Sequence, residues 1–169
     1  MRPLRITLDT NLLVPGLIGA ARMPPAATAT AALVRAAQAR VIALVVSDPL
    51  LAEVERVLQD PSFAVSVRTA RRMVRAVRGI ATVVEIPGKL AVLTVDPDDN
   101  VILETAVAGK ADLLATNNLA HFEEVRSRAE APLRFRGVDI VSLSRCHERI
   151  REDWPEADAL LRKVWRWNL

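Results

Sequence analysis

The sequence predicts an α/β fold, a three-layer α/β/α sandwich around a central, mostly parallel, five-stranded sheet. Short aliphatic runs alternate along the chain with helical patterns, as consecutive βαβ units require. The aliphatic runs are continuously apolar, which is typical of a sheet covered by helices on both faces. A length of 169 residues favours one domain with a substantial core.

The five expected strands are the aliphatic or β-branched runs at residues 6–8, 41–46, 82–86, 113–115 and 138–143. Helical patterns lie between them at 26–40, 49–59, 65–78 and 100–110, with a short one after Asn118. We expect Pro24-Pro25 and Asp48-Pro49 to open helices, the second with Ser47 or Asp48 as N-cap. Residues 127–136 are expected to form a surface loop. The predicted organisation is one domain over residues 1–144 and a helical tail over 145–169.

The composition excludes several classes of protein. No apolar stretch is long enough to span a membrane, and Asp9 interrupts the first apolar run, so we expect a cytoplasmic protein without an export signal. The single Cys146 excludes an internal disulfide, and two histidines give little support for a His/Cys zinc site. The formal charge of +3 comes from arginine, which permits nucleic acid as a partner.

Carboxylates follow the expected strands. Asp9 comes directly after the first strand, where ligands bind in open α/β sheets. Glu53 lies one turn into the helix after the second strand, although a surface glutamate is the commoner explanation and Glu55 is a neighbouring candidate. Both side chains are expected at the same edge of the sheet.

Two later segments carry further polar groups to a strand end or helix start. In Asp96-Pro97-Asp98-Asp99-Asn100, the helix dipole accounts for one or two carboxylates, but a third adds repulsion that a divalent cation would relieve. Asp99 is the best placed of the three, on the first turn of the helix. After the fourth strand, Thr116 and Asn118 offer a hydroxyl and an amide that can orient a carboxylate, although a turn capped by asparagine is the favoured explanation of this segment taken alone.

The order and content of these segments resemble the PIN-domain family, the ribonuclease fold of many bacterial toxins of the VapC type. The matching segments are Leu8-Asp9-Thr10-Asn11, Ser47 to Glu53, Asp96 to Asn100 with Leu103-Glu104 and Ala106, and Leu114 to Asn118 with Phe122. The resemblance runs from about residue 6 to residue 142. It implies that Asp9, Glu53 and Asp99 are catalytic acids and metal ligands.

Asn118 stands in the position of the family's fourth acid, and Asn11 and Thr116 are expected to brace the site. An amide cannot carry the charge of a carboxylate, so Asn118 puts the binding of a second metal ion in question. The phosphatase and receiver folds also place Asp at strand ends, but Asn11 stands where a phosphatase needs a second aspartate.

The resemblance implies an endoribonuclease that uses one or two Mg²⁺ or Mn²⁺ ions, which oxygen ligands favour over zinc. It further implies the toxin of a type II toxin–antitoxin pair, held by a small antitoxin protein. A homodimer or a higher homo-oligomer is left open. The alternative is a degenerate, non-catalytic PIN-like module that binds nucleic acid or a protein partner, which Asn118 favours.

Outside these motifs, five arginines recur at helical spacing and are expected to form one positive stripe. They are Arg68, Arg71, Arg72, Arg75 and Arg78. A surface that follows the RNA backbone and a merely solvated face explain the stripe equally well. The tail carries Trp154, Trp165 and Trp167, for which packing onto the domain is favoured over contact with a partner.

Overall fold

The structure, a computed structural model, describes residues 2–22, 28–127 and 131–166, without the side chains of residues 160 and 164–166. The expected helix start at Pro24-Pro25 lies outside the described residues, as do the side chains of Trp165 and Trp167.

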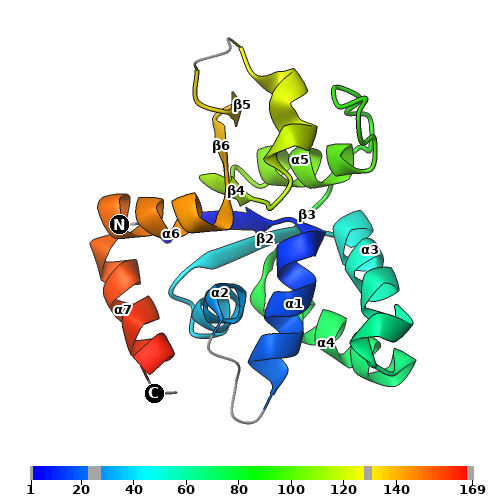
Figure 1. The fold of residues 1–169 in the computed structure, drawn as a ribbon, viewed down its shortest axis with the longest axis vertical. Helices are drawn as coiled ribbons and strands as arrows, with labels where there is room; N and C mark the ends of the chain where they lie inside the picture. Colours follow the sequence, from blue (N-terminus) through cyan, green and yellow to red (C-terminus); the bar gives the residue numbers. More distant parts are fainter. Residues whose placement is uncertain (1, 23–27, 128–130, 167–169) are drawn as a thin grey trace.

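The described chain forms strands, α-helices and two short 3-10 helices (Figure 1). The strands are β1 (Arg5–Leu8), β2 (Ala43–Ser47), β3 (Thr82–Val84), β4 (Leu113–Ala115), β5 (Arg134–Phe135) and β6 (Val138–Val141). The α-helices are α1 (Thr10–Ala21), α2 (Ala29–Gln38), α3 (Asp48–Leu58), α4 (Val67–Ile80), α5 (Asp99–Ala108), α6 (Leu143–Asp153) and α7 (Pro155–Arg166). The 3-10 helices are η1 (Pro61–Phe63) and η2 (Leu119–Val125).

The predicted α/β fold is confirmed, with α5 on one face of the sheet and α1 and α2 on the other (Figure 1). The strand order is β3-β2-β1-β4-β6-β5, and every pairing is parallel except the one between β5 and β6. The sheet has six strands, so the expected count of five was wrong by one. The extra strand, β5, lies in the expected loop 127–136 and pairs with β6 through a tight turn. Arg136 and Gly137 both have positive φ in that turn, 46° and 90°, as a two-residue hairpin loop requires.

The sheet topology determines where a ligand site is expected. From β1 the chain first builds β2 and β3 on one side of β1, and then returns to place β4 on the other side. The strand order therefore reverses between β1 and β4. In open α/β sheets the crevice outside the carboxyl ends of the strands at such a reversal is where ligands bind. Asp9 and Thr116 follow directly on these two strands.

Helix α1, which the sequence pattern did not predict, packs closely against α2. Its central residues are buried on nearly every side, including Leu13, Val14 and Gly16. A Cβ atom on Gly16 would lie 3.0 Å from the backbone oxygen of Thr30 in α2. The glycine therefore permits the close approach of the two helices, which holds the start of α1, beside Asp9, against the domain.

The expected helical tail forms α6 and α7, and α7 lies beside α2 (Figure 1). Cys146 and Ile150 of α6 and Ala157 and Leu161 of α7 are buried in the same core cluster as the sheet. Trp154, between the two helices, packs partly buried against this core. Among the described residues, none of the helices combines the length and apolar character needed to cross a membrane.

Candidate active site

Asp9 is held at the carboxyl end of β1 by hydrogen bonds with the start of α1 and with the end of β4 and the residue after it. Its backbone N–H donates to the carbonyl oxygen of Ala115 in β4 at 2.9 Å. Its Oδ2 accepts from Asn11 Nδ2 at 2.7 Å and from Thr116 Oγ1 at 2.5 Å. These contacts fix the orientation of the carboxylate, as donors around metal-binding carboxylates commonly do. Burial raises the pKa of Asp9, and the hydrogen bonds from Thr116 and Asn11 oppose that rise.

Glu53 is positioned by the packing of α3 against α5. Ser47 is the N-cap of α3 and accepts from the backbone N–H of Leu50, so it is Ser47 rather than Asp48 that caps this helix. The buried Ser47 hydroxyl lies 2.6 Å from the hydroxyl of Thr105 on α5. This contact ties the start of the helix that carries Glu53 to the helix that carries Asp99.

Glu53 is partly buried and faces other negative charge. Its pKa is raised, first by desolvation and then by the charges of Asp9 and Asp98. A cavity of about 320 Å³ opens beside it and is lined by residues of α3 together with Asp98 and Val101. The carboxylate therefore lies at an open cavity between α3 and α5.

Asp99, the first residue of α5, shows the strongest effect of this clustering. Its pKa is raised from 3.8 to about 6, first by desolvation and then by the charges of Asp9 and Asp96, while His121 opposes the rise. Asp9 thus acts on both Glu53 and Asp99. Asp9 therefore repels the carboxylates of two helices at the sheet edge, and a divalent cation would relieve that repulsion. Carboxylate oxygens of this kind are the donors that Mg²⁺ and Mn²⁺ take.

Asn118 contacts the site through its backbone. Its side chain is exposed, and its N–H donates to Thr116 Oγ1 at 2.9 Å. The Thr116 hydroxyl thus accepts from Asn118 and donates to Asp9. Hydrogen bonds join Asp9, Asn11 and Thr116, and the charge of Asp9 acts on Glu53 and Asp99. The amide group of Asn118 makes no hydrogen bond among the described residues.

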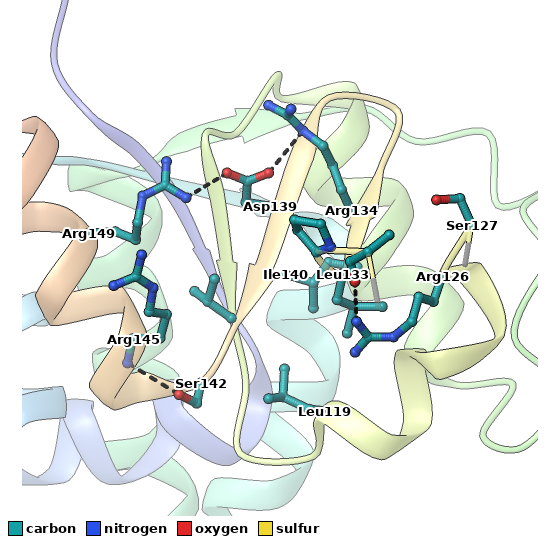
Figure 2. A pocket seen from close by; sticks show the side chains of 13 residues that line it. Leu119, Arg126, Ser127, Leu133, Arg134, Asp139, Ile140, Ser142, Arg145 and Arg149 are labelled. Carbon is teal, nitrogen blue, oxygen red and sulfur yellow. Dashed lines mark hydrogen bonds and ion pairs between the residues drawn. The ribbon is translucent and has the colours of Figure 1, made fainter. Parts of the chain in front are cut away.

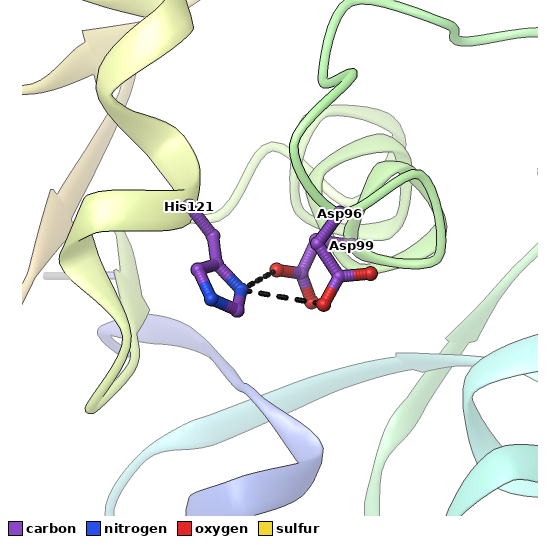
Figure 3. Close-up of side chains that lie close together, drawn as sticks. All are labelled: Asp96, Asp99 and His121. Atoms are coloured by element: carbon purple, nitrogen blue, oxygen red, sulfur yellow. Dashed lines mark hydrogen bonds and ion pairs between the residues drawn. The ribbon is translucent and has the colours of Figure 1, made fainter.

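His121 joins the site although the sequence did not single it out. Figure 3 shows its ring facing the carboxylates of Asp96 and Asp99. His121 Nδ1 lies 2.9 Å from Asp99 Oδ2 and 3.3 Å from Asp96 Oδ2. One ligand atom from each of the three residues lies within 4.8 Å of the others. The only sequence signal for His121 is its place between Asn118 and Phe122 in the segment already assigned to the site.

The loop that carries Asp96 is tied down at two points. The buried side chain of Asn100 accepts from the backbone of Val92 and Leu93, both at 3.0 Å. It also donates to the carbonyl oxygens of Leu93 and Pro97 at 2.8 and 2.9 Å. From η2, Glu124 accepts from the backbone N–H groups that follow Leu93, at 2.6 and 3.0 Å. The loop is therefore linked both to α5 and to the 3-10 helix that carries His121.

The five arginines of the predicted stripe are all exposed on α4, whose Ala70 and Val77 are buried. Arg71 pairs with Glu55 at 3.3 Å, and Arg78 pairs with Asp48. Both acidic partners belong to α3, the helix of Glu53. The positive face thus adjoins an element of the site, and its contact with RNA stays a proposal.

A second cavity, of about 620 Å³, lies between η2, β6 and α6 (Figure 2). Four arginines line it: Arg126, Arg134, Arg145 and Arg149. Arg134 and Arg149 both pair with Asp139, at 2.9 and 2.8 Å, and the other two pair with nearby glutamates. None of the carboxylates of the candidate site lines this cavity.

The comparisons with known proteins agree with this geometry. A family model described as the PIN domain matches residues 5–120, more than half of the chain. The match includes Asp9, Glu53, Asp99 and Asn118 and ends one residue before His121. Neither the curated proteins nor the solved structures contain a match. PIN domains are generally nucleases and typically use divalent metal ions. On the extent of this match, the chain belongs to the PIN-domain family.

Proposed function

We propose that this protein is a metal-dependent endoribonuclease that hydrolyses phosphodiester bonds of RNA with Mg²⁺ or Mn²⁺. One observation carries the proposal: Asp9, Glu53 and Asp99 converge at the carboxyl ends of the central strands in a chain of a nuclease family. The electrostatic coupling of these residues supports a site built to bind positive charge.

Each residue has a role in this proposal. Asp9 and Asp99 are ligands of one or two divalent ions, and Glu53 is a further ligand or the base that orients the attacking water. A bound ion supplies the positive charge that lowers the pKa of this water and offsets the charge of the phosphodiester. The raised pKa of Glu53 suits a group that accepts the proton of the attacking water. Asn11 and Thr116 hold Asp9 in orientation, and Asn118 holds the Thr116 hydroxyl through its backbone.

The test compares Asp9→Asn with the intact protein. We expect cleavage of single-stranded RNA in Mg²⁺ or Mn²⁺, no cleavage with a chelator, and a loss of at least about 100-fold in the variant, because general acid–base and metal catalysis depend on the carboxylates. Asp153→Asn is the matched control, since it makes the same chemical change at an exposed position of α6 and should cleave normally. Full metal-dependent activity in a clean preparation of Asp9→Asn contradicts the proposal.

The non-catalytic alternative has its own outcome in this test. Asn118 favours it, since the position of a fourth acid carries an exposed amide. RNA binding without cleavage in any metal would assign the chain to this class.

We also propose that the protein is the cytoplasmic toxin of a type II toxin–antitoxin pair. The family resemblance supports this role, which requires a small antitoxin protein. This role predicts that a neighbouring gene encodes a short DNA-binding protein. When that protein is added to the purified chain, it should suppress RNA cleavage. A neighbour without this effect contradicts the toxin role and leaves the nuclease proposal standing.

A further inference from the structure

His121 is a nitrogen donor beside two carboxylates of the acidic site. Its Nδ1 faces two carboxylates of one acidic motif, Asp96 at the end of the loop and Asp99 at the start of α5 (Figure 3). None of the roles proposed above uses His121 or Asp96. The family match ends before this residue, so a role for His121 must be argued from its own contacts.

The segments that carry the three ligand atoms are linked to one another. Glu124, three residues after His121 on η2, accepts the backbone N–H groups of Thr94 and Val95 at 2.6 and 3.0 Å. It thereby links η2 directly to the loop of Asp96. Asn100 ties the same loop to α5, where Asp99 lies. The three ligand atoms are therefore held together by the fold, and a ligand set held in place in this way is typical of metal sites.

We propose that His121 Nδ1 binds the same divalent ion as Asp99, with Asp96 as the third protein ligand, and that this set selects Mn²⁺ over Mg²⁺. The inference rests on the proposed metal-dependent nuclease and names its preferred ion. Mg²⁺ takes oxygen ligands and retains much of its water. Imidazole suits first-row transition-metal ions, and although Mn²⁺ is the weakest binder of that series, it exchanges water for a nitrogen ligand more readily than Mg²⁺, so a nitrogen in the set raises the affinity for Mn²⁺ more than that for Mg²⁺.

His121 could instead contact Asp96 and Asp99 without binding the ion, and this role predicts different metal affinities. A histidine that only balances the charge of Asp96 and Asp99 would make no bond to the ion. Its replacement would then change the binding of Mg²⁺ and Mn²⁺ by the same factor, because both ions carry the same charge. The ratio of the two affinities therefore separates a ligand from a counter-ion.

The first experiment measures Mn²⁺ and Mg²⁺ affinities by titration calorimetry and by the metal-dependent shift in Tm. In the intact protein we expect Mn²⁺ to bind at least about tenfold more tightly than Mg²⁺. In His121→Asn we expect the affinity for Mn²⁺ to fall at least about tenfold, because the loss of even a residue that only supports a metal ligand typically lowers metal affinity by this factor or more. His121→Asp should keep Mg²⁺ binding, since it restores an oxygen ligand. Glu123→Gln, on the exposed side of η2, changes a side chain of the same 3-10 helix outside the ligand set and should leave the ratio unchanged.

The second experiment observes the bond itself. The electron paramagnetic resonance spectrum of the Mn²⁺ complex should contain a coupling to a directly bound nitrogen. Labelling the protein with ¹⁵N-histidine should change that coupling, and His121→Asn should abolish it. The labelled intact protein needs no substitution, so the result does not depend on the folding of a variant. Absence of a histidine coupling, or an equal change of both affinities in His121→Asn, overturns the proposal.

The two proposals fail separately. RNA cleavage that depends on Asp9 but shows no preference for Mn²⁺ and no nitrogen coupling would leave the nuclease standing and reject the role of His121. Nitrogen coupling in a protein that cleaves no RNA with either ion would keep the metal site and reject the nuclease.

Discussion

At the scale of single residues, Asp99 shows how the site opposes the stability of the fold. The pKa of its carboxyl is about 6 in the folded protein, above the ordinary value of 3.8. Between these two values the folded protein binds more protons than the unfolded chain. The free energy of unfolding therefore falls as the pH rises through this window, and the ionised carboxylate disfavours folding at neutral pH. The pKa values of Asp9 and Glu53 are raised as well, so both act in the same direction.

We expect Asp99→Asn to stabilise the metal-free protein at pH 7 by on the order of 1 kcal/mol, because it removes a charge that burial and its neighbours disfavour. Urea denaturation in the presence of a chelator measures this difference. The intact protein should gain stability between pH 7 and pH 5, and the variant should gain less. A variant that is less stable than the intact protein at pH 7 would show that the contact with His121 outweighs the repulsion.

At the scale of elements, the loop between β3 and α5 depends on Asn100. The side chain uses its oxygen twice and its amide nitrogen twice, and all four partners are backbone groups of the loop. Asn100, the last residue of the acidic motif, therefore has a structural role, since it stabilises the loop conformation that places Asp96 beside His121. A motif that looks wholly catalytic in the sequence thus contains a structural member.

We expect Asn100→Ala to lower the free energy of unfolding by roughly 1–3 kcal/mol, because buried backbone groups lose their partners. Urea denaturation compares the variant with Asn117→Ala, whose side chain is exposed and whose stability should be unchanged. The variant should also bind Mn²⁺ more weakly, since the loop no longer holds Asp96 in place. Stability equal to that of the intact protein would mean that water replaces the amide without loss.

The elements that the sequence predicted are those with a strong local signal. The run 113–115 matches β4, and the pattern 100–110 overlaps α5. Helix α1 was missed because it is apolar on nearly every side, which removes the helical period, and because Pro15 and Gly16 are typical of turns. Strand β5 has two residues, too few for any periodic signal.

The residues of the candidate site also fall into those that the sequence could place and those that it could not. Residues that follow a strand or open a helix, such as Asp9, Thr116 and Asp99, could be placed because the sheet topology brings strand ends together. His121 could not be placed, because its contact with Asp96 depends on the path of an irregular loop and of a 3-10 helix. A lone histidine has no spacing pattern, and only the tertiary structure brings it to the carboxylates.

At the scale of the whole molecule, the negative site and the positive stripe lie on neighbouring elements. For the proposed RNA substrate, the carboxylates would repel the phosphate backbone until an ion is bound, so the attraction would have to come from another surface. The arginines of α4 are exposed, and Arg68, Arg72 and Arg75 form no ion pair among the described residues. Since α4 contacts α3, we expect RNA that follows this helix to be brought toward the element that carries Glu53.

We expect the double variant Arg72→Ala and Arg75→Ala to bind RNA more weakly and with a smaller dependence on salt. For single strands, the slope of log K against log salt should fall by about 0.7 for each phosphate contact that is lost. Fluorescence anisotropy with the inactive Asp9→Asn background measures binding without cleavage. The control changes Arg151 and Arg162, which are exposed on α6 and α7, and alters the net charge by the same amount. If both double variants lose the same affinity, RNA responds to the overall charge of the protein, and the stripe on α4 is a solvated face.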